Sequence, residues 1–157
     1  MAWLEGSALG HAMRTSGVWT YGLVNLTHIL GVGSLFGAVL VLDLRMLGAW
    51  RSVPLAAITR PTVPVAAAGF LVAAASGVCL IATNATEYVG NPFLLVKFPA
   101  IAVGLANVVV LTRSAAWKVR DVRELTSPEQ RQLAAAGAVS LLSWLTAMTA
   151  GRLIGYW

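Results

Sequence analysis

The sequence predicts an all-α integral membrane protein, an antiparallel four-helix bundle with a short interfacial helix at its N-terminus. Hydrophobic residues make up 58% of the 157 residues and charged residues only 11%, whereas soluble domains carry roughly 25% charged residues. Four apolar segments are each long enough to cross a bilayer, which takes about 20 helical residues. No stretch alternates with period two, as the strands of a membrane β-barrel would.

The four expected spans form one transmembrane domain joined by short links. They run over about 18–42, 63–82, 93–111 and 133–154. The segment before the first span, MAWLEGSALGHAMR, lacks the basic start of a cleavable signal peptide. We expect it to lie along the outer interface as a short helix. Before the fourth span, Ser127 fits an N-cap, with Pro128 at the first helical position and Gln130 completing a capping box.

The distribution of basic residues predicts the orientation. Eight of the eleven lysines and arginines lie in the links between spans one and two and between spans three and four. The positive-inside rule therefore places both links in the cytoplasm and both termini outside a bacterial inner membrane. We interpret the basic run 113–131 as a solvated face of this kind, and the net charge of +5 does not indicate nucleic acid. Asp43 and Arg45 are expected to mark the inner interface, paired with each other or with span-two neighbours.

Small residues predict how the helices pack, because helices in lipid approach one another through small side chains. Such residues recur at helical spacing on three of the spans. They are Gly33 and Gly37, then Gly69, Ala73 and Gly77, then Ser140, Ser143, Ala147 and Gly151.

The candidate functional site centres on His28, the only histidine within a span. An ionisable ring in lipid is costly, so it normally faces the bundle interior or a cavity. Two polar residues share its stripe, and cationic and thioether side chains on spans three and four reach a similar depth. The candidate cofactor-binding residues are His28, Met148, Lys97, Arg152, Asn25, Tyr21 and His11.

Each candidate also has a purely structural interpretation. His28 fits a neutral core histidine bonded to a carbonyl, and Lys97 and Arg152 fit side chains that extend to the outer headgroups. Met148 fits ordinary packing. The inner half of the bundle has no equivalent cluster. Sequence signatures of soluble hydrolases, metalloproteases and nucleotide-binding enzymes are absent.

The segments HILGVGSLFGAVLVLDLRMLG and KFPAIAVGLAN carry a resemblance that extends over most of the chain. The chain resembles an uncharacterised family of small bacterial four-helix inner-membrane proteins. More distantly it is similar to copper-resistance D proteins and to the membrane subunits of b-type cytochromes. That resemblance implies a bundle that holds haem or serves copper handling. One intramembrane histidine excludes two bis-histidine haems, and leaves one haem with His28 as metal ligand and His11, Met148 or an open position opposite.

The first functional hypothesis is a redox subunit that binds one haem b and passes electrons between a periplasmic partner and quinone. Lys97 and Arg152 would then pair with the haem propionates. The alternatives are a non-haem site for quinone or a small anion, copper handling through His11, Met13, His28 and Met148, and a structural subunit of a larger complex. Whether the protein is an enzyme stays open. Expected partners are the bilayer and a membrane or periplasmic protein, with self-association a further option.

The charge distribution generates a topology prediction. A reporter fused after Trp157 should be active if it works only in the periplasm and inactive if it works only in the cytoplasm, because the basic links resist translocation. Fusions within the link 113–131 should give the reverse pattern. Cytoplasmic activity at the C-terminus would contradict the assignment.

Overall fold

The computed structural model describes every residue from Met1 to Trp157 and confirms an all-helical membrane architecture. No strand is present, and four helices are long and apolar enough to cross a bilayer. These are α3 (Gly17–Leu47), α4 (Leu55–Thr83), α5 (Pro92–Arg113) and α7 (Ser127–Leu153). The shorter elements are α1 (Ala2–Glu5), α2 (Ala8–Thr15), α6 (Ala115–Val119) and a terminal 3₁₀ turn, η1 (Ile154–Tyr156).

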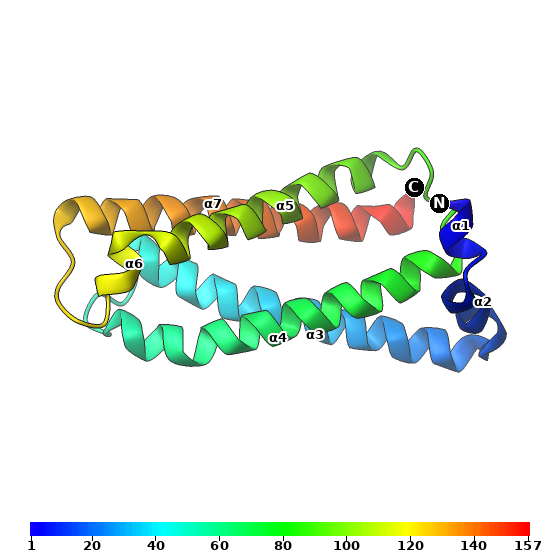
Figure 1. Ribbon diagram of the computed structural model, residues 1–157, viewed down its shortest axis with the longest axis horizontal. Coiled ribbons are helices and arrows are strands. Elements are labelled where there is room, and N and C mark those ends of the chain that lie inside the picture. Colours follow the sequence, from blue (N-terminus) through cyan, green and yellow to red (C-terminus); the bar gives the residue numbers. More distant parts are fainter.

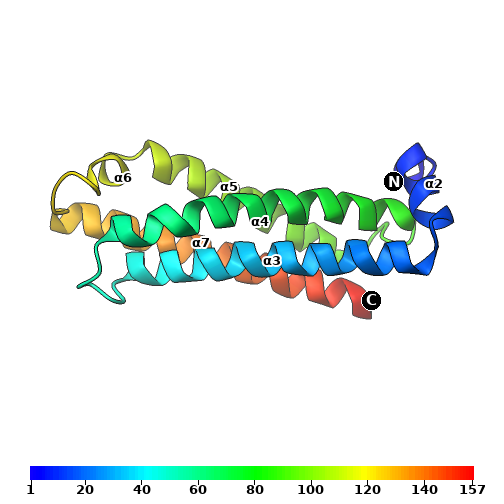
Figure 2. The same cartoon turned by 90° about the horizontal axis from the view of Figure 1, so that it is seen from below.

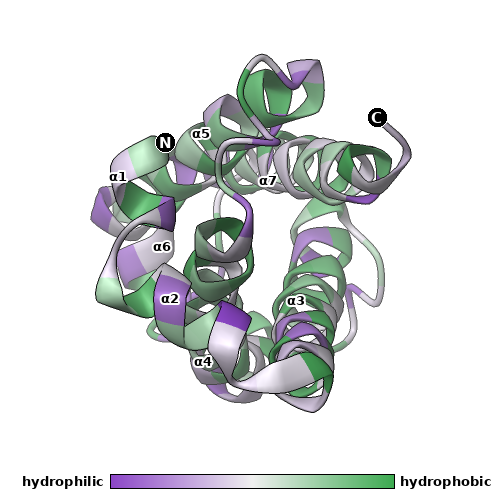
Figure 3. Ribbon diagram, turned by 90° about the vertical axis from the view of Figure 1, so that its right-hand side faces the viewer, coloured by the Kyte–Doolittle hydropathy of each residue, from purple (hydrophilic) through white to green (hydrophobic).

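The long helices run antiparallel, so both termini lie at the same end of the molecule as the α4–α5 link (Figure 1). The two basic links lie together at the opposite end. Seen from the end that holds the termini, apolar colours dominate the long helices, and polar colours gather in the short helices and the links (Figure 3). This arrangement is the one that the spacing of the apolar segments predicts.

The capping box of α7 differs by one residue from the prediction. Thr126, and not Ser127, is the N-cap, and the Glu129 carboxylate accepts a hydrogen bond from its backbone N–H at 2.8 Å. Arg123 holds that carboxylate with two further bonds of 2.9 and 2.7 Å. A charged carboxylate clamped in this way is a stronger partner than the amide of Gln130 would be.

The bundle consists of two helix pairs. α3 packs against α4, α5 packs against α7, and the pairs join through α3 and α7 (Figures 1 and 2). The short link between the second and third spans predicts that α4 and α5 are close neighbours, and this prediction is wrong, because the two helices do not pack against each other. That link, residues 84–91, can reach about 27 Å when extended, well beyond the 8–10 Å of packed helices.

Trp144 on α7 accounts for the separation of α4 from α5. Its ring meets Phe70 of α4 edge-on, with centroids 6.1 Å apart. On the other side it lies so close to Gly104 of α5 that an added β-carbon there would be 3.2 Å from the indole. A wide ring between the two helices prevents their backbones from meeting.

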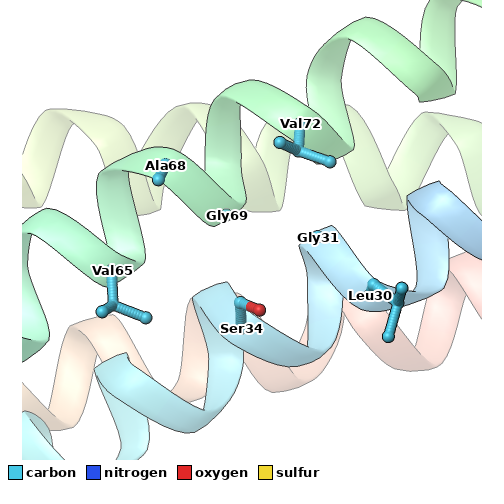
Figure 4. A pocket seen from close by; sticks show the side chains of 7 residues that line it. All are labelled: Leu30, Gly31, Ser34, Val65, Ala68, Gly69 and Val72. Atoms are coloured by element: carbon cyan, nitrogen blue, oxygen red, sulfur yellow. The ribbon is translucent and has the colours of Figure 1, made fainter.

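The tightest contact between long helices is formed by Gly31 of α3 and Gly69 of α4, which face each other where the helices cross (Figure 4). A β-carbon added to Gly31 would lie 2.7 Å from the backbone nitrogen of Ala73, and one added to Gly69 would lie 2.6 Å from that of Leu35. A shallow groove of about 300 Å³ flanks the crossing and contains no ionisable group. The contact therefore requires glycine on both helices.

The packing stripes are only partly those predicted from the sequence. Gly33 and Gly37 do not pack, because an added β-carbon at either position would meet nothing within 4 Å. Of the other small residues in the predicted stripes, five are buried, and Gly77 and Gly151 are half-buried. Those that are buried are Gly69, Ala73, Ser140, Ser143 and Ala147. On α3 the contact falls on Gly31, which continues the stripe of His28.

The N-terminal segment forms two short helices that are tied to the α4–α5 link. The Glu5 carboxylate accepts bonds from the backbone N–H and the hydroxyl of Thr86 at 2.7 and 2.6 Å. These bonds lower the pKa of Glu5 below its ordinary value. Arg14 donates to the carbonyls of Thr83 and Glu5 at 3.0 and 2.8 Å. The segment is thus docked on the protein as well as being amphipathic.

The glycine crossing generates a stability prediction. Gly69→Ala should lower the thermal unfolding temperature in detergent, because the added methyl group overlaps the α3 backbone and overpacking costs about 1–3 kcal/mol. Gly33→Ala is the matched control on the open face and should leave that temperature unchanged or slightly higher. Equal effects of the two substitutions would show that α3 and α4 do not meet at Gly69.

Candidate ligand site around His28

His28 points into the bundle and is anchored on α4. Its Nδ1 lies 2.8 Å from the carbonyl oxygen of Ala73 and 3.1 Å from the hydroxyl of Ser76. A carbonyl only accepts, so Nδ1 carries the hydrogen and a neutral ring keeps a free lone pair on Nε2. The side chain is half-buried, and its fixed ring presents one unsatisfied nitrogen.

Gly77 makes this anchoring geometry accessible. In a helix the carbonyl of Ala73 is covered by the residue four positions later, which is Gly77. A β-carbon at that position would lie 3.1 Å from Cε1 and 3.4 Å from Nδ1 of His28. Ser76 donates its own hydroxyl hydrogen to Val72 at 2.6 Å and so can accept from the ring. Gly77 leaves room for the imidazole ring, and the Ser76 hydroxyl can accept a hydrogen bond from its edge.

Lys97 supplies the positive charge of this region. Its Nζ lies over the backbone of α7, 3.3 Å from where a β-carbon of Gly151 would be. The side chain is half-buried. No acidic residue forms an ion pair with Lys97, since the only two salt bridges of the chain are elsewhere. An unpaired ammonium group beside apolar helices favours an anionic or carbonyl-bearing ligand.

Trp144 adds a second unpaired donor that the sequence reading did not identify. The residue is 6% exposed, and its Nε1 is buried with no hydrogen-bond partner. An unpaired N–H in a dry interior is uncommon and calls for a partner. The available sequence signal was a tryptophan in the middle of a span, far from the interfacial belts where this residue usually lies.

The other candidates lie apart from this interior group. Asn25 is exposed. Tyr88 of the α4–α5 link has a raised pKa, chiefly because it is partly buried and to a lesser degree because of Tyr21. Arg152 is exposed, stacks on Tyr156 with 4.7 Å to the ring centroid and bonds to its hydroxyl at 2.5 Å.

The two remaining candidates were the potential second axial ligands. Met148 is 37% exposed, and His11 is exposed on α2. The structure therefore places His28 against α4 and Lys97 against α7 within the bundle, and leaves both of these side chains at the surface.

The half of the bundle nearer the two basic links also holds a buried ionisable group, Asp43. Asp43 is 1% exposed, faces Ser140 of α7, and has one carboxyl oxygen without a partner. The expectation that it marks the interface and pairs with Arg45 is wrong, because Arg45 donates to the carbonyl of Val53 at 2.8 Å. Asp43 is covered because α7 is already helical from Ser127 and passes over the end of α3 at Gly137.

A protein-family model described as "Family of unknown function (DUF6644)" matches residues 1–157. No curated protein matches the chain, and no solved structure matches it.

The geometry of His28 generates a spectroscopic prediction. Nitrogen-15 NMR of histidine-labelled protein at mildly alkaline pH should show His28 with hydrogen on Nδ1 and none on Nε2, because the Ala73 carbonyl only accepts. His11, exposed on α2, is the internal reference and should show no such fixed tautomer. Gly77→Leu should remove the signature by displacing the ring. A His28 signal protonated only at Nε2 would contradict the anchoring.

Proposed function

The chain belongs to the family of unknown function DUF6644, and we propose that it is a membrane redox subunit that binds one lipid-soluble quinone in the outer half of the bundle. The single observation that carries the proposal is the anchored His28, whose Nδ1 is bonded to Ala73 and whose Nε2 is free. In that tautomer Nε2 accepts the O–H of a hydroquinone. The same nitrogen can then accept a proton that is released when the hydroquinone is oxidised.

Donors for the carbonyl oxygens of a quinone come from two other helices. Lys97 on α5 has no acidic partner, and the indole N–H of Trp144 on α7 has no partner of any kind. Trp144 packs on Phe70, which lies two turns, about 10 Å, along α4 from the Gly77 seat of His28. A flat ring with carbonyls at opposite ends suits groups that are spaced along a helix in this way.

The route into such a site supports a ligand that is dissolved in the membrane. α4 and α5 do not pack against each other, so no direct contact between these two helices closes the bundle on that side. A quinone diffuses within the bilayer and can enter sideways without crossing the headgroups. Reduction would take two electrons from a protein partner and two protons, and gives the hydroquinone.

A single haem b is the second candidate, and one observation favours it. A histidine whose Nδ1–H donates to a carbonyl while Nε2 is free has the arrangement of a metal-bound imidazole. His28 would hold the iron, Lys97 would pair with a propionate, and haem would supply one-electron transfer. The fit is poorer than that of a quinone, because Met148 and His11 are exposed and Arg152 is engaged by Tyr156.

The proposal predicts a binding defect in defined variants. Equilibrium binding of a radiolabelled short-chain quinone to the purified protein should be lost in His28→Leu. It should weaken about tenfold in Trp144→Phe, because removing one hydrogen-bond partner costs about 1–3 kcal/mol. Trp19→Phe, at an exposed position on α3, is the matched control and should bind like the unaltered protein.

An absorption spectrum of the same sample separates the two candidates. A Soret band that disappears in His28→Leu would assign haem in place of quinone. Protein that folds, binds no quinone and shows no Soret band would overturn both, and His28 would then be a structural residue that holds α3 to α4.

A further inference from the structure

A large polar cavity lies at the basic end of the molecule, far from His28. It measures about 940 Å³ and is enclosed by the α3–α4 turn on one side and by the α6–α7 link with the start of α7 on the other. Cavities of about 300–1,000 Å³ are the usual size of small-ligand sites. The sequence alone favoured a solvated basic face here, and Arg51, Arg123 and Arg131 are exposed, but they border one common space.

The cavity is lined by more positive than negative charge. Its basic residues are Arg45, Arg51, Arg120, Arg123 and Arg131. Two of the five have acidic partners in the chain: Arg123 pairs with Glu129 at 2.7 Å, and Arg120 with Asp121 at 3.3 Å. The other three arginines have no acidic partner, and Asp121 and Glu124 are the only carboxylates in the lining, so the cavity holds net positive charge.

Two of the three unpaired guanidinium groups, those of Arg45 and Arg51, are held by the fold. Arg45 donates to the carbonyl of Val53 at 2.8 Å. Arg51 lies across Gly48, the residue that ends α3 with φ +110°, where a β-carbon would come within 3.1 Å of its guanidinium. The negative end of a helix dipole favours a cation at that place. Gly48 thus adopts the left-handed backbone conformation that ends α3, and it leaves room for the Arg51 guanidinium.

Arg120 is a further arginine with a fixed side chain, on the opposite wall of the cavity. Its guanidinium stacks on the Trp117 ring at 4.1 Å from the centroid, and its Nε is buried with no partner. Stacked arginines keep their hydrogen-bonding fork in one orientation. The buried Nε is a further donor on this wall that lacks an acceptor, and the net positive charge of the cavity favours a ligand with several acceptor oxygens.

We propose that this cavity binds a phosphate-bearing ligand, with Arg51 and Arg131 as its principal charged contacts. Guanidinium groups match phosphate oxygens in geometry and charge, and bind them in pairs of parallel hydrogen bonds. Two sources present that chemistry at the edge of a membrane: the headgroup of an anionic phospholipid and a soluble phosphate. The proposal is independent of the ligand at His28.

The test measures thermal unfolding of the detergent-purified protein by intrinsic fluorescence in two arms at equal ionic strength. One arm adds phosphatidylglycerol against phosphatidylcholine, and the other adds inorganic phosphate against chloride. Ligand binding to the folded state raises the unfolding temperature. We expect a rise in at least one arm, and in the double variant Arg51→Gln/Arg131→Gln we expect the apparent affinity to fall about tenfold or more.

The matched control is Arg60→Gln/Arg113→Gln, which removes the same charge from exposed positions outside the cavity. It should retain the rise. A response to phosphatidylglycerol alone identifies the lipid headgroup as the source, and a response to inorganic phosphate alone identifies a soluble ligand. The proposal is overturned if neither arm responds, or if the control double variant loses the response as fully as the cavity variant does.

Discussion

The crossing of α3 over α4 at Gly31 and Gly69 is the constraint on which the rest of the half of the bundle that holds the termini depends. In a bilayer the hydrophobic effect does not drive helices together, because lipid tails are as apolar as the helices, so close backbone packing must stabilise their association. Two missing side chains bring the helices near enough for the His28 imidazole to reach the Ala73 carbonyl, one turn farther along α4. A wider crossing would leave Nδ1 without its acceptor.

A second constraint acts on the opposite side of the bundle. Trp144 lies between Gly104 of α5 and Phe70 of α4, and the same residue that fills this space also leaves its own N–H without a partner. Natural interiors rarely contain such a group without a reason. The indole therefore combines a structural task, which is the separation of two helices, with an unmet hydrogen bond in the region where a ligand is proposed.

The sequence predicted the number and approximate positions of the spans well because those properties depend on composition summed over about 20 residues. It predicted helix faces poorly. Gly33 and Gly37 were as plausible a contact as Gly31, since lipid and protein interiors are equally apolar and hydropathy does not distinguish the buried face of such a helix.

The candidate site shows the same division between what is local and what is long-range. His28 was identifiable because a polar ring in a span must face something polar. The free Nε2 was not, because it follows from a carbonyl on another helix, 45 residues later in the chain. The burial of Asp43 likewise depends on how far α7 extends at its start. The orientation of Arg152 depends on a tyrosine four residues away that has an equally ordinary role as an interfacial anchor.

The docking of the N-terminal helices has a consequence for how the chain is assembled. Glu5 and Arg14 are made first, but their partners Thr86 and Thr83 follow 81 and 69 residues later. At about 5–20 residues per second, these partners are synthesised roughly 3–16 seconds afterwards. During that interval the segment has none of these bonds and stays undocked at the surface of the membrane. The bonds to the α4–α5 link therefore close only after α3 and α4 are both in place, so docking of the N-terminus reports that the first helical hairpin has been inserted completely.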